Sequence, residues 1–357
     1  MYIDNIKIKN FRNINEESVF LSSNLNILIG KNANGKTNFL ESVYIPSNFN
    51  SFRTNKIDNL ILNKNIKTVI NINYFTNKIN SQVQFNLFKN KKEFYLNNKK
   101  INSYTDINFL YKTILYNPED IYIIKGNPLL RRNLLDKSIF LINNDYLKEY
   151  KIFLNCLKQR NKFLKLNEKY DNIWDVNYII CSKKILDSRI SFLLEINTII
   201  ENIKKYFGFK DKFIELKYLP ILKNIENDFE KNFYLNKHKD EKYKFTTYGP
   251  HRDNPSFFID EKDAASHCSQ GQQKLLILLF KTALFHLFSS KNEMKPILIF
   301  DDITGDLDQN NKNTFIEYIL GNAGQVFMTS TDYNLRNNNN FLNANFFEVQ
   351  NGKFLNL

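Results

Sequence analysis

The sequence predicts an α/β fold in which a mixed sheet with helices carries an inserted, mostly α-helical lobe. Three observations indicate it. The first hundred residues hold short β-branched runs, residues 131–207 contain neither glycine nor proline, and short strands alternate with helices again after about residue 245. A chain of 357 residues also exceeds the roughly 250–300 at which a single core stops growing. We therefore expect one lobe from residues 1–115 and 241–357, and an inserted helical lobe from residues 116–240.

Composition limits the class of protein. Hydrophobic residues make up 43% of the chain and charged residues 24%, which excludes global disorder. The longest apolar run, Leu275–Phe280, is far shorter than the about 20 residues of a membrane-spanning helix. The first residues, Met1–Asn5, lack the basic region and the apolar region of a secretory signal. The three cysteines lie far apart in the sequence, which favours a reducing compartment. We expect a cytoplasmic protein with no membrane partner.

The chain is basic, with 50 Lys and Arg against 37 Asp and Glu, which gives a formal net charge of +13. Such a balance suits a polyanionic partner such as nucleic acid, an acidic membrane surface or an acidic protein. Lys, Asn, Ile and Phe are abundant along the whole chain, however, so the charge also fits a general compositional bias. The charge alone does not choose between these two interpretations.

The N-terminal part reads as strands. An apolar strand, Leu25–Ile29, runs directly into a loop that contains glycine. Further along, Val83, Phe85 and Leu87 alternate with polar residues, which is the period of a half-buried strand. A tight turn is expected at Asn97–Asn98.

The middle of the chain reads as long helices. In residues 145–166, apolar residues recur at steps of three and four, and this predicts one buried helix face made of Leu147, Tyr150, Leu154, Leu157 and Leu164. A second helical pattern runs from about Trp174 to Phe207 and stops at Gly208, the residue type expected just past a helix end.

The C-terminal part returns to strands. Buried strands are expected at Ile297–Phe300 and Val326–Met328. A terminal hairpin is expected from Ala344–Val349 and Phe354–Leu355, because Asn351–Gly352 suits the positive φ angles of a type I′ turn.

A phosphate-binding loop follows the strand Leu25–Ile29, because the next eight residues match G-x-x-x-x-G-K-[ST] in full. Glycines let backbone N–H groups converge on phosphate oxygens, and the following helix adds its positive dipole end. In this pattern the lysine neutralises phosphate charge and the threonine hydroxyl coordinates Mg²⁺. The eight residues are Gly30, Lys31, Asn32, Ala33, Asn34, Gly35, Lys36 and Thr37.

Two carboxylates follow the predicted strand Ile297–Phe300. If this strand is parallel to the one before the phosphate loop, Asp301 reaches the Mg²⁺ ion. The adjacent Asp302 could then orient or deprotonate an attacking water. Because neighbouring residues of a strand point to opposite faces, the two acids need different roles.

A further motif begins a helix that includes Leu275, Leu279 and Leu284. By itself it is an ordinary helix N-cap, but together with the phosphate loop and the acid-tipped strand it resembles the signature loop of ABC-type ATPases. Gly305–Asp308 resembles the D-loop of the same class. The signature-like residues are Ser269, Gln270, Gly271 and Gln272.

The resemblance extends along the whole chain to the RecF family of bacterial replication and repair ATPases, which are related to SMC-type heads. Several segments carry it in the order of the family, and Tyr248–Asp253 (Tyr-Gly-Pro-His-Arg-Asp) is the most specific. The others are Lys9–Asn13, Ser51–Arg53, Asn117–Asp120, Lys125–Gly126 and Arg131–Asp136.

The resemblance implies an ABC/SMC-type P-loop ATPase head with an inserted helical lobe. It implies binding of ATP and Mg²⁺, an ATP-dependent homodimer, and a weak DNA-stimulated ATPase that acts as a release switch. The implied DNA is single-stranded and gapped double-stranded, and the implied partners are RecR and RecO, which help to load RecA.

Roles carry over onto matching residues. The resemblance implies that Gly30–Thr37 bind phosphates, that Asp301 joins Thr37 at Mg²⁺, and that Asp302 with Lys36 is catalytic. Ser269–Gln272 would contact the γ-phosphate held by the partner subunit, and Asp306 and Asp308 would lie in the D-loop. Gly305 departs from the family, where Ser begins the D-loop. After the strand Val326–Met328 the usual sensing His is absent, and Thr331 is only a candidate.

A DNA face is suggested by five lysines at steps of three, seven, four and three along residues 145–166. A solvated face in a lysine-rich protein is the competing interpretation, and a second candidate face contains Lys89–Lys92 and Lys99–Lys100. The five lysines are Lys148, Lys151, Lys158, Lys162 and Lys165.

His251 and Arg252 could sense phosphate or DNA, or could belong to a structural turn.

Two alternatives belong to other classes. An ATPase subunit of a membrane transporter would carry a standard signature loop, and DNA would not stimulate its hydrolysis. A P-loop kinase or GTPase would leave the Ser269–Gln273 motif and the D-loop without an explanation.

Overall fold

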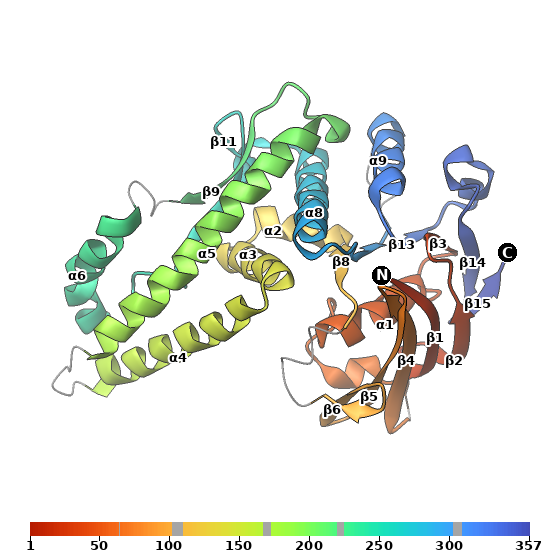
Figure 1. The fold of residues 1–357 in the computed structure, drawn as a ribbon, viewed down its shortest axis with the longest axis horizontal. Coiled ribbons are helices and arrows are strands. Elements are labelled where there is room, and N and C mark those ends of the chain that lie inside the picture. The colour runs from red at the N-terminus through yellow and green to blue at the C-terminus, as the bar shows by residue number, and fades with distance from the viewer. Residues whose placement is uncertain (64, 102–109, 167–172, 220–224, 303–308) are drawn as a thin grey trace. The chain divides into compact units, whose positions relative to one another are not determined.

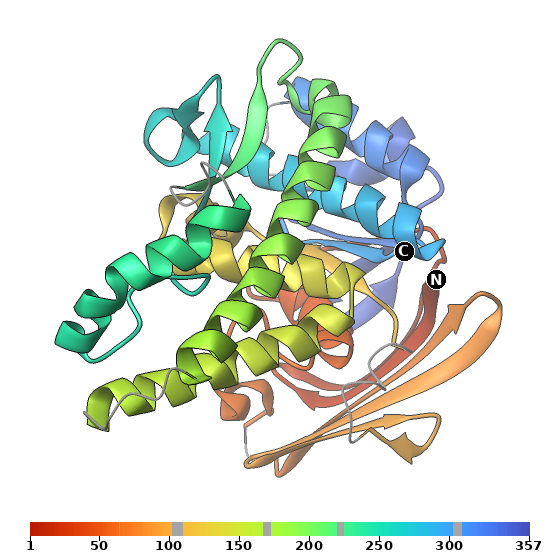
Figure 2. The same ribbon diagram turned by 60° about the vertical axis from the view of Figure 1, so that its left-hand side comes forward.

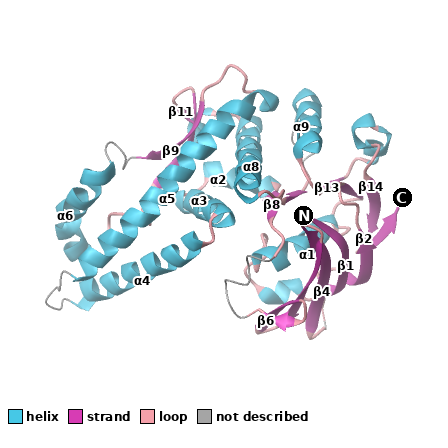
Figure 3. Ribbon diagram, in the orientation of Figure 1, coloured by secondary structure: helices cyan, strands magenta, loops and turns pink. Residues whose placement is uncertain are grey.

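The computed structural model describes residues 1–63, 65–101, 110–166, 173–219, 225–302 and 309–357. The chain forms two compact units. The first contains Met1–Glu119 and Phe288–Leu357, and the second contains Asp120–Leu287. Strands dominate the first unit and helices the second (Figure 3). No helix within the described residues has the length and apolar character needed to cross a membrane.

One sheet of the first unit is antiparallel, with the strand order β2-β1-β4-β5-β6-β7 (Figure 1). The predicted turn after β6 is confirmed, because Asn97 and Asn98 both have positive φ angles. The strands are β1 (Tyr2–Phe11), β2 (Ile14–Phe20), β4 (Lys67–Thr76), β5 (Ile79–Phe88), β6 (Lys91–Leu96) and β7 (Lys99–Lys100).

The second sheet of this unit has the order β15-β14-β3-β13-β12-β8, and all its pairs are parallel except β14 with β15. The terminal hairpin is confirmed, with φ angles of 48° at Asn351 and 81° at Gly352. The strands are β3 (Leu25–Ile29), β8 (Thr113–Tyr116), β12 (Ile297–Phe300), β13 (Val326–Ser330), β14 (Asn345–Gln350) and β15 (Lys353–Asn356).

Helix α1 (Lys36–Asn48) packs between these two sheets and contributes Phe39, Leu40 and Val43 to their common core. The short helix η1 (Ile57–Leu60) and helix α9 (Gln309–Asn322) belong to the same unit. Two short 3₁₀ turns, η6 (Tyr333–Asn337) and η7 (Asn339–Phe341), precede β14.

The second unit is mostly helical, and the long α5 runs through it (Figure 2). The helix predicted to stop at Gly208 is confirmed, because α5 passes into η4 (Lys204–Phe207) and Gly208 follows with a φ angle of 75°. The helices of this unit are α2 (Ile121–Lys125), α3 (Pro128–Ile142), α4 (Asp145–Leu166), α5 (Ile173–Ile203), α6 (Ile225–Tyr243), α7 (Ala264–His267) and α8 (Gln270–Asn292) as far as Leu287.

A small antiparallel sheet, β11-β10-β9, completes this unit. Its strands are β9 (Ile214–Leu219), β10 (Asn254–Ile259) and β11 (Lys262–Asp263). Because β10 pairs with β9 and packs against α3, the second unit extends to Leu287, whereas the sequence placed the end of the inserted lobe at residue 240.

The buried face of α4 differs from the prediction. Leu154, expected in the core, is 44% exposed, whereas Arg160 is fully buried. Arg160 is paired with Asp175 of α5 at 2.8 Å and with Asp240 of α6 at 2.7 Å. A charged residue on the core side turns the helix relative to the face that apolar periodicity selects. The buried residues of α4 are Tyr146, Phe153, Cys156, Arg160 and Leu164.

The α4–α5 contact also brings together two cysteines that are far apart in the sequence. The Sγ atoms of Cys156 and Cys181 are 3.4 Å apart, and both thiols are reduced. Burial raises the pKa of Cys181 to about 11, so this thiol stays protonated near neutral pH.

A second buried arginine organises the segment Tyr248–Asp253. Arg189 of α5 makes a bidentate pair with Asp136 at 2.8 and 2.9 Å and donates to the Pro250 carbonyl at 2.8 Å. Arg252 N donates to the Gly249 carbonyl at 2.8 Å, which closes a turn. Of the two interpretations of this segment, the contacts therefore favour the structural turn.

His251 lies in the same turn, where Nε2 is 3.0 Å from the Thr246 carbonyl and therefore carries the proton. Burial lowers the pKa of His251 to about 4. The contribution of the neutral imidazole to the free energy of unfolding is fully present above about pH 6.5, the ordinary pKa of histidine. It is lost as the pH falls toward the folded-state pKa, because the unfolded chain takes up the proton more readily.

Gly249 is required in this turn by its φ angle of 133° and by Tyr178, whose hydroxyl would lie 2.0 Å from an added Cβ. We predict that Gly249→Ala lowers the free energy of unfolding by more than about 2 kcal/mol in urea titrations. Gly271→Ala is the matched control in the same unit, because its Cβ would meet only the Ser269 hydroxyl at 4.0 Å. Equal effects of the two substitutions would contradict this prediction.

The pH dependence of stability tests the buried imidazole. We predict that the difference in unfolding free energy between the wild type and His251→Gln shrinks by up to about 3 kcal/mol between about pH 7 and pH 4. The reason is that only the wild type loses stability when this group must accept a proton. A difference that is constant with pH would show that His251 is not held neutral by the fold.

Candidate functional site

The predicted phosphate loop connects β3, all of whose residues are buried, to α1, which begins at Lys36. Two loop residues have left-handed backbone conformations, with φ angles of 67° at Ala33 and 114° at Gly35. This conformation turns successive N–H groups toward one point, next to the N-terminus of α1. The described backbone therefore has the form of an anion-binding loop.

The outer side of the loop is held by the C-terminal hairpin and by the β1–β2 turn. An added Cβ on Gly30 would lie 2.5 Å from the Val349 carbonyl, so glycine is required there. Asn34 donates to the same carbonyl at 2.9 Å, and Gly352 N donates to the Asn34 carbonyl at 2.8 Å. Asn13 also donates to the Asn34 carbonyl, at 3.2 Å. These contacts fix the loop before any ligand arrives.

The Lys36 ammonium lies inside the loop. Its Nζ donates to the carbonyls of Gly30 at 2.6 Å and Lys31 at 3.0 Å. Burial lowers the pKa of Lys36, and the charges of Asp302 and Asp301 act in the opposite direction. The positive charge is thus placed where phosphate oxygens would meet the loop.

Asp301 connects the phosphate loop to the acid-tipped strand. Its Oδ1 accepts hydrogen bonds from Thr37 at 2.9 Å and from Thr329 at 2.7 Å. Burial raises the pKa of Asp301, and the two hydroxyls act in the opposite direction. The expected parallel relation to β3 is present in the sheet, with β13 between β3 and β12.

Thr329 is a site residue that the sequence did not single out. It lies at the end of β13, where its hydroxyl also accepts from Asp302 N at 2.8 Å. Asp302 has a positive φ angle of 50°, so this hydrogen bond holds the second acid in an uncommon conformation. Thr331, the candidate that the sequence suggested, is exposed and lies beyond the strand. Thr329 and Ser330 are two hydroxyl residues at the end of an apolar strand, and this was the signal in the sequence for Thr329.

The donor set at Asp301 suits Mg²⁺. A threonine hydroxyl and a carboxylate are hard oxygen ligands, and Mg²⁺ is commonly held by one or two protein groups together with phosphates and waters. Within the described residues, no group of three or more His, Cys, Asp or Glu side chains could hold a metal by itself. The site therefore fits a magnesium ion that arrives with a phosphate ligand.

Two sequence segments that carried the family resemblance meet at α1. Arg12 makes a bidentate pair with the fully buried Glu41, at 2.8 and 2.7 Å. Arg53 donates to Asn38 at 2.7 Å and lies 3.6 Å from Glu41, and Ser51 also donates to Glu41. These contacts hold the helix that follows the phosphate loop.

The signature-like residues lie in the second unit at the start of α8. Ser269 and Gln272 form a capping box, in which the Ser269 hydroxyl accepts from Gln272 N at 3.3 Å and the Gln272 side chain accepts from Ser269 N at 3.0 Å. Ser269, Gln270, Gly271 and Gln272 are all exposed. The D-loop residues Gly305, Asp306 and Asp308 lie outside the described residues.

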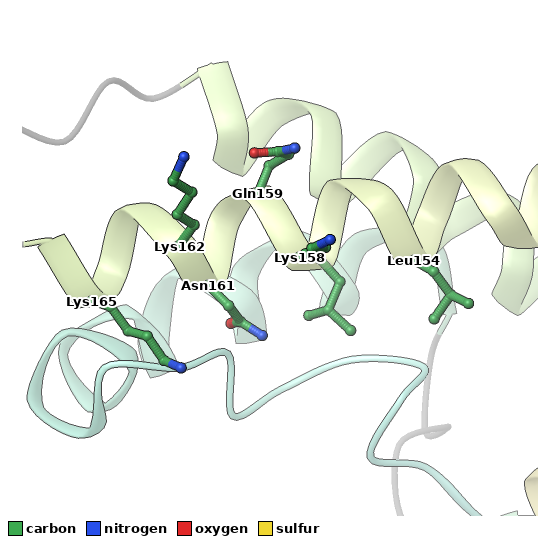
Figure 4. A pocket seen from close by; sticks show the side chains of 7 residues that line it. Leu154, Lys158, Gln159, Asn161, Lys162 and Lys165 are labelled. Atoms are coloured by element: carbon green, nitrogen blue, oxygen red, sulfur yellow. The ribbon is translucent and has the colours of Figure 1, made fainter.

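The five lysines of α4 are exposed on the side opposite to its buried face. Lys148 is paired with Asp145 at 2.8 Å. Lys158, Lys162 and Lys165 line an open groove of about 640 Å³ (Figure 4).

The competing lysines around β6 are partly neutralised. Lys91 and Lys100 both pair with Glu93, at 2.5 and 3.4 Å. Lys92 donates to the Phe49 carbonyl at 3.1 Å. Fewer positive charges are therefore available there than the sequence suggested.

Comparisons with known proteins identify the family of the chain. Residues 2–353 match the family described as the RecF/RecN/SMC N terminal domain. The chain is 33% identical to the DNA replication and repair protein RecF of Clostridium beijerinckii, over 100% of this chain and 99% of that protein. It is 32% identical to RecF of Clostridium botulinum strain 657, over 99% of each chain.

Solved structures give the same result. A structure of the recombination mediator protein RecF with ATP, from the RecFOR pathway, matches with a TM-score of 0.88 and 26% identity over 100% of this chain and 99% of that one. An Smc head domain from Pyrococcus furiosus matches with a TM-score of 0.57 and 14% identity over 100% of this chain and 96% of that one, which shows a shared fold. The chain therefore belongs to the RecF family, within the RecF/RecN/SMC N terminal domain proteins.

Proposed function

We propose that this protein is an ATP-dependent DNA-binding protein of replication and recombinational repair, with slow hydrolysis as its release switch. One observation carries the proposal: Asp301 joins the Thr37 hydroxyl at the mouth of a complete phosphate loop. The RecF relatives support it, because they are replication and repair proteins and one of them was solved with ATP.

In the proposed mechanism the loop Gly30–Thr37 binds the phosphates of ATP through its backbone, and Lys36 neutralises their charge. Thr37 and Asp301 would hold Mg²⁺, and the ion would supply positive charge to the phosphates. Asp302 orients or deprotonates the attacking water, and the hydrogen bond from its N–H to Thr329 fixes its position.

The proposed homodimer forms around ATP. Ser269–Gln272 are exposed at the N-terminus of α8, where a hydroxyl, backbone N–H groups and the helix dipole are available to an anion. We propose that they contact the γ-phosphate bound by a second copy of the chain. Hydrolysis removes that phosphate and therefore weakens the dimer.

The proposed macromolecular partners are single-stranded and gapped double-stranded DNA, with RecR and RecO as protein partners in RecA loading. The net charge of +13 and the α4 lysines Lys148, Lys151, Lys158, Lys162 and Lys165 support a polyanionic partner. The relatives named for the RecFOR pathway support the protein partners.

Lys36→Arg tests the switch. The charge survives, but the bulkier guanidinium does not fit between the Gly30 and Lys31 carbonyls, so we predict loss of the ATP-dependent dimer or of turnover with the fold intact. Sedimentation of the wild type and the variant with ATP, with ADP, and with ATP plus gapped DNA measures this. The proposal would be overturned if the wild type stays monomeric with ATP and its rate of ATP hydrolysis is the same with and without DNA.

Thr329→Val tests whether the Thr329 hydroxyl holds Asp301 and Asp302 in place. We predict that it weakens Mg²⁺-dependent ATP binding about tenfold, because a hydrogen bond to a charged group is lost, whereas Thr329→Ser retains near-normal affinity. Thr331→Val, at the exposed position two residues on, serves as the matched control and should leave affinity unchanged. Titration of a fluorescent ATP analogue with and without Mg²⁺ distinguishes the two threonines.

A further inference from the structure

Two exposed aromatic side chains lie beside the α4 groove. Tyr243 ends α6 and is 56% exposed, and Phe245 follows it and is 37% exposed. Their ring centroids are 6.1 Å apart. Two neighbouring exposed rings offer flat apolar surface on which a ligand ring can stack.

Hydrogen bonds fix the position of these rings relative to the groove. Thr246 donates through its N–H and its hydroxyl to Asn161 Oδ1, at 2.7 and 2.8 Å, and Asn161 lines the groove. Thr247 N donates to Asp240 at 2.8 Å, and Asp240 is paired with the buried Arg160. Figure 4 shows that the side chains of Asn161 and Lys165 project from α4 toward a neighbouring loop. The aromatic segment is therefore attached to the groove wall by satisfied polar contacts.

Positive charge surrounds both the groove and the rings. Lys158, Lys162 and Lys165 are exposed along about 10 Å of helix, and no ion pair involves them within the part of the chain that the structure describes. The Arg252 guanidinium lies 5.1 Å from the Phe245 ring centroid, and Lys242 Nζ lies 5.9 Å from that of Tyr243. Cations held against a ring face leave charge beside the stacking surface.

A ligand that matches this surface carries phosphates and accessible flat rings together. Duplex DNA offers phosphates, but its bases are stacked inside. A single strand offers both, since each of its bases has a face that can stack on an aromatic side chain. We propose that Lys158, Lys162, Lys165, Tyr243 and Phe245 form a binding surface for single-stranded DNA. This inference rests on the proposed DNA-binding function and assigns the single-stranded part of its DNA to a defined place.

The surface is expected to work without large rearrangement. The buried Arg160–Asp240 pair and the Thr246–Asn161 hydrogen bonds already hold the two halves of the surface together. Binding therefore costs little ordering of the protein, and it needs no nucleotide at the phosphate loop.

The test uses the full chain without nucleotide and two fluorescent probes, an oligodeoxythymidine of about 20 nucleotides and a duplex of equal length. We expect Tyr243→Ala with Phe245→Ala to weaken oligodeoxythymidine binding at least about fivefold and duplex binding much less, because stacking is lost. Tyr243→Phe with Phe245→Tyr keeps both rings and should bind the single strand as the wild type does.

The lysines are tested by the salt dependence of the same binding. Replacement of Lys158, Lys162 and Lys165 by Gln should reduce the slope of log K against log salt by about 1.5–2, since each phosphate contact on a single strand contributes about 0.7. The matched control replaces three exposed lysines of the same unit, Lys184, Lys210 and Lys262, and should leave the slope unchanged.

The inference is overturned if the double alanine variant binds oligodeoxythymidine as tightly as the wild type does, or if its affinity for both probes falls equally. It is also overturned if the two triple lysine variants change the salt slope by the same amount. The proposed function is measured separately, by the ATP-dependent dimer and its effect on gapped DNA. A wild type that binds the single strand through these residues but forms no such dimer would remove the proposed switch and leave the surface in place.

Discussion

Three parallel strands that end at one edge of a sheet set the chemistry of the first unit. Strand β13 pairs with β3 on one side and with β12 on the other, so Ser330 lies opposite Ile29 and Met328 opposite Phe300. This register places Thr37 within hydrogen-bonding distance of Asp301, although 264 positions separate them in the sequence. The residues that we propose for phosphate binding, Mg²⁺ binding and water activation can share one site only because these strand ends coincide.

The same edge would be of little use if the loop between β3 and α1 could change shape. Backbone N–H groups bind phosphate well only when they already point at it. The C-terminal hairpin and the β1–β2 turn supply that rigidity through Val349, Gly352 and Asn13. The buried Arg12–Glu41 pair anchors the following helix. The first and the last strands of the chain therefore act on the phosphate loop between them.

Much of this could be predicted from the sequence, where local chemistry decides the structure. The phosphate loop, the acid-tipped strand and the terminal hairpin each follow from a few adjacent residues. Thr329 could not be predicted in this way, because its role depends on β13 lying between β3 and β12, and strand order is not encoded locally. The Cys156–Cys181 contact was missed for the same reason, since it depends on how α4 packs against α5.

The buried face of α4 shows how one charged residue can overrule an apolar pattern. Periodicity selected the leucines, including Leu154, but Arg160 finds Asp175 and Asp240 in the interior. Two buried carboxylates without this guanidinium would be strongly destabilising, so the ion pairs determine how the helix is turned. That rotation places Lys158, Lys162 and Lys165 on the exposed side and leaves Leu154 at the groove. The basic surface is thus a consequence of a buried ion-pair network, and the net charge of +13 by itself would not have located it.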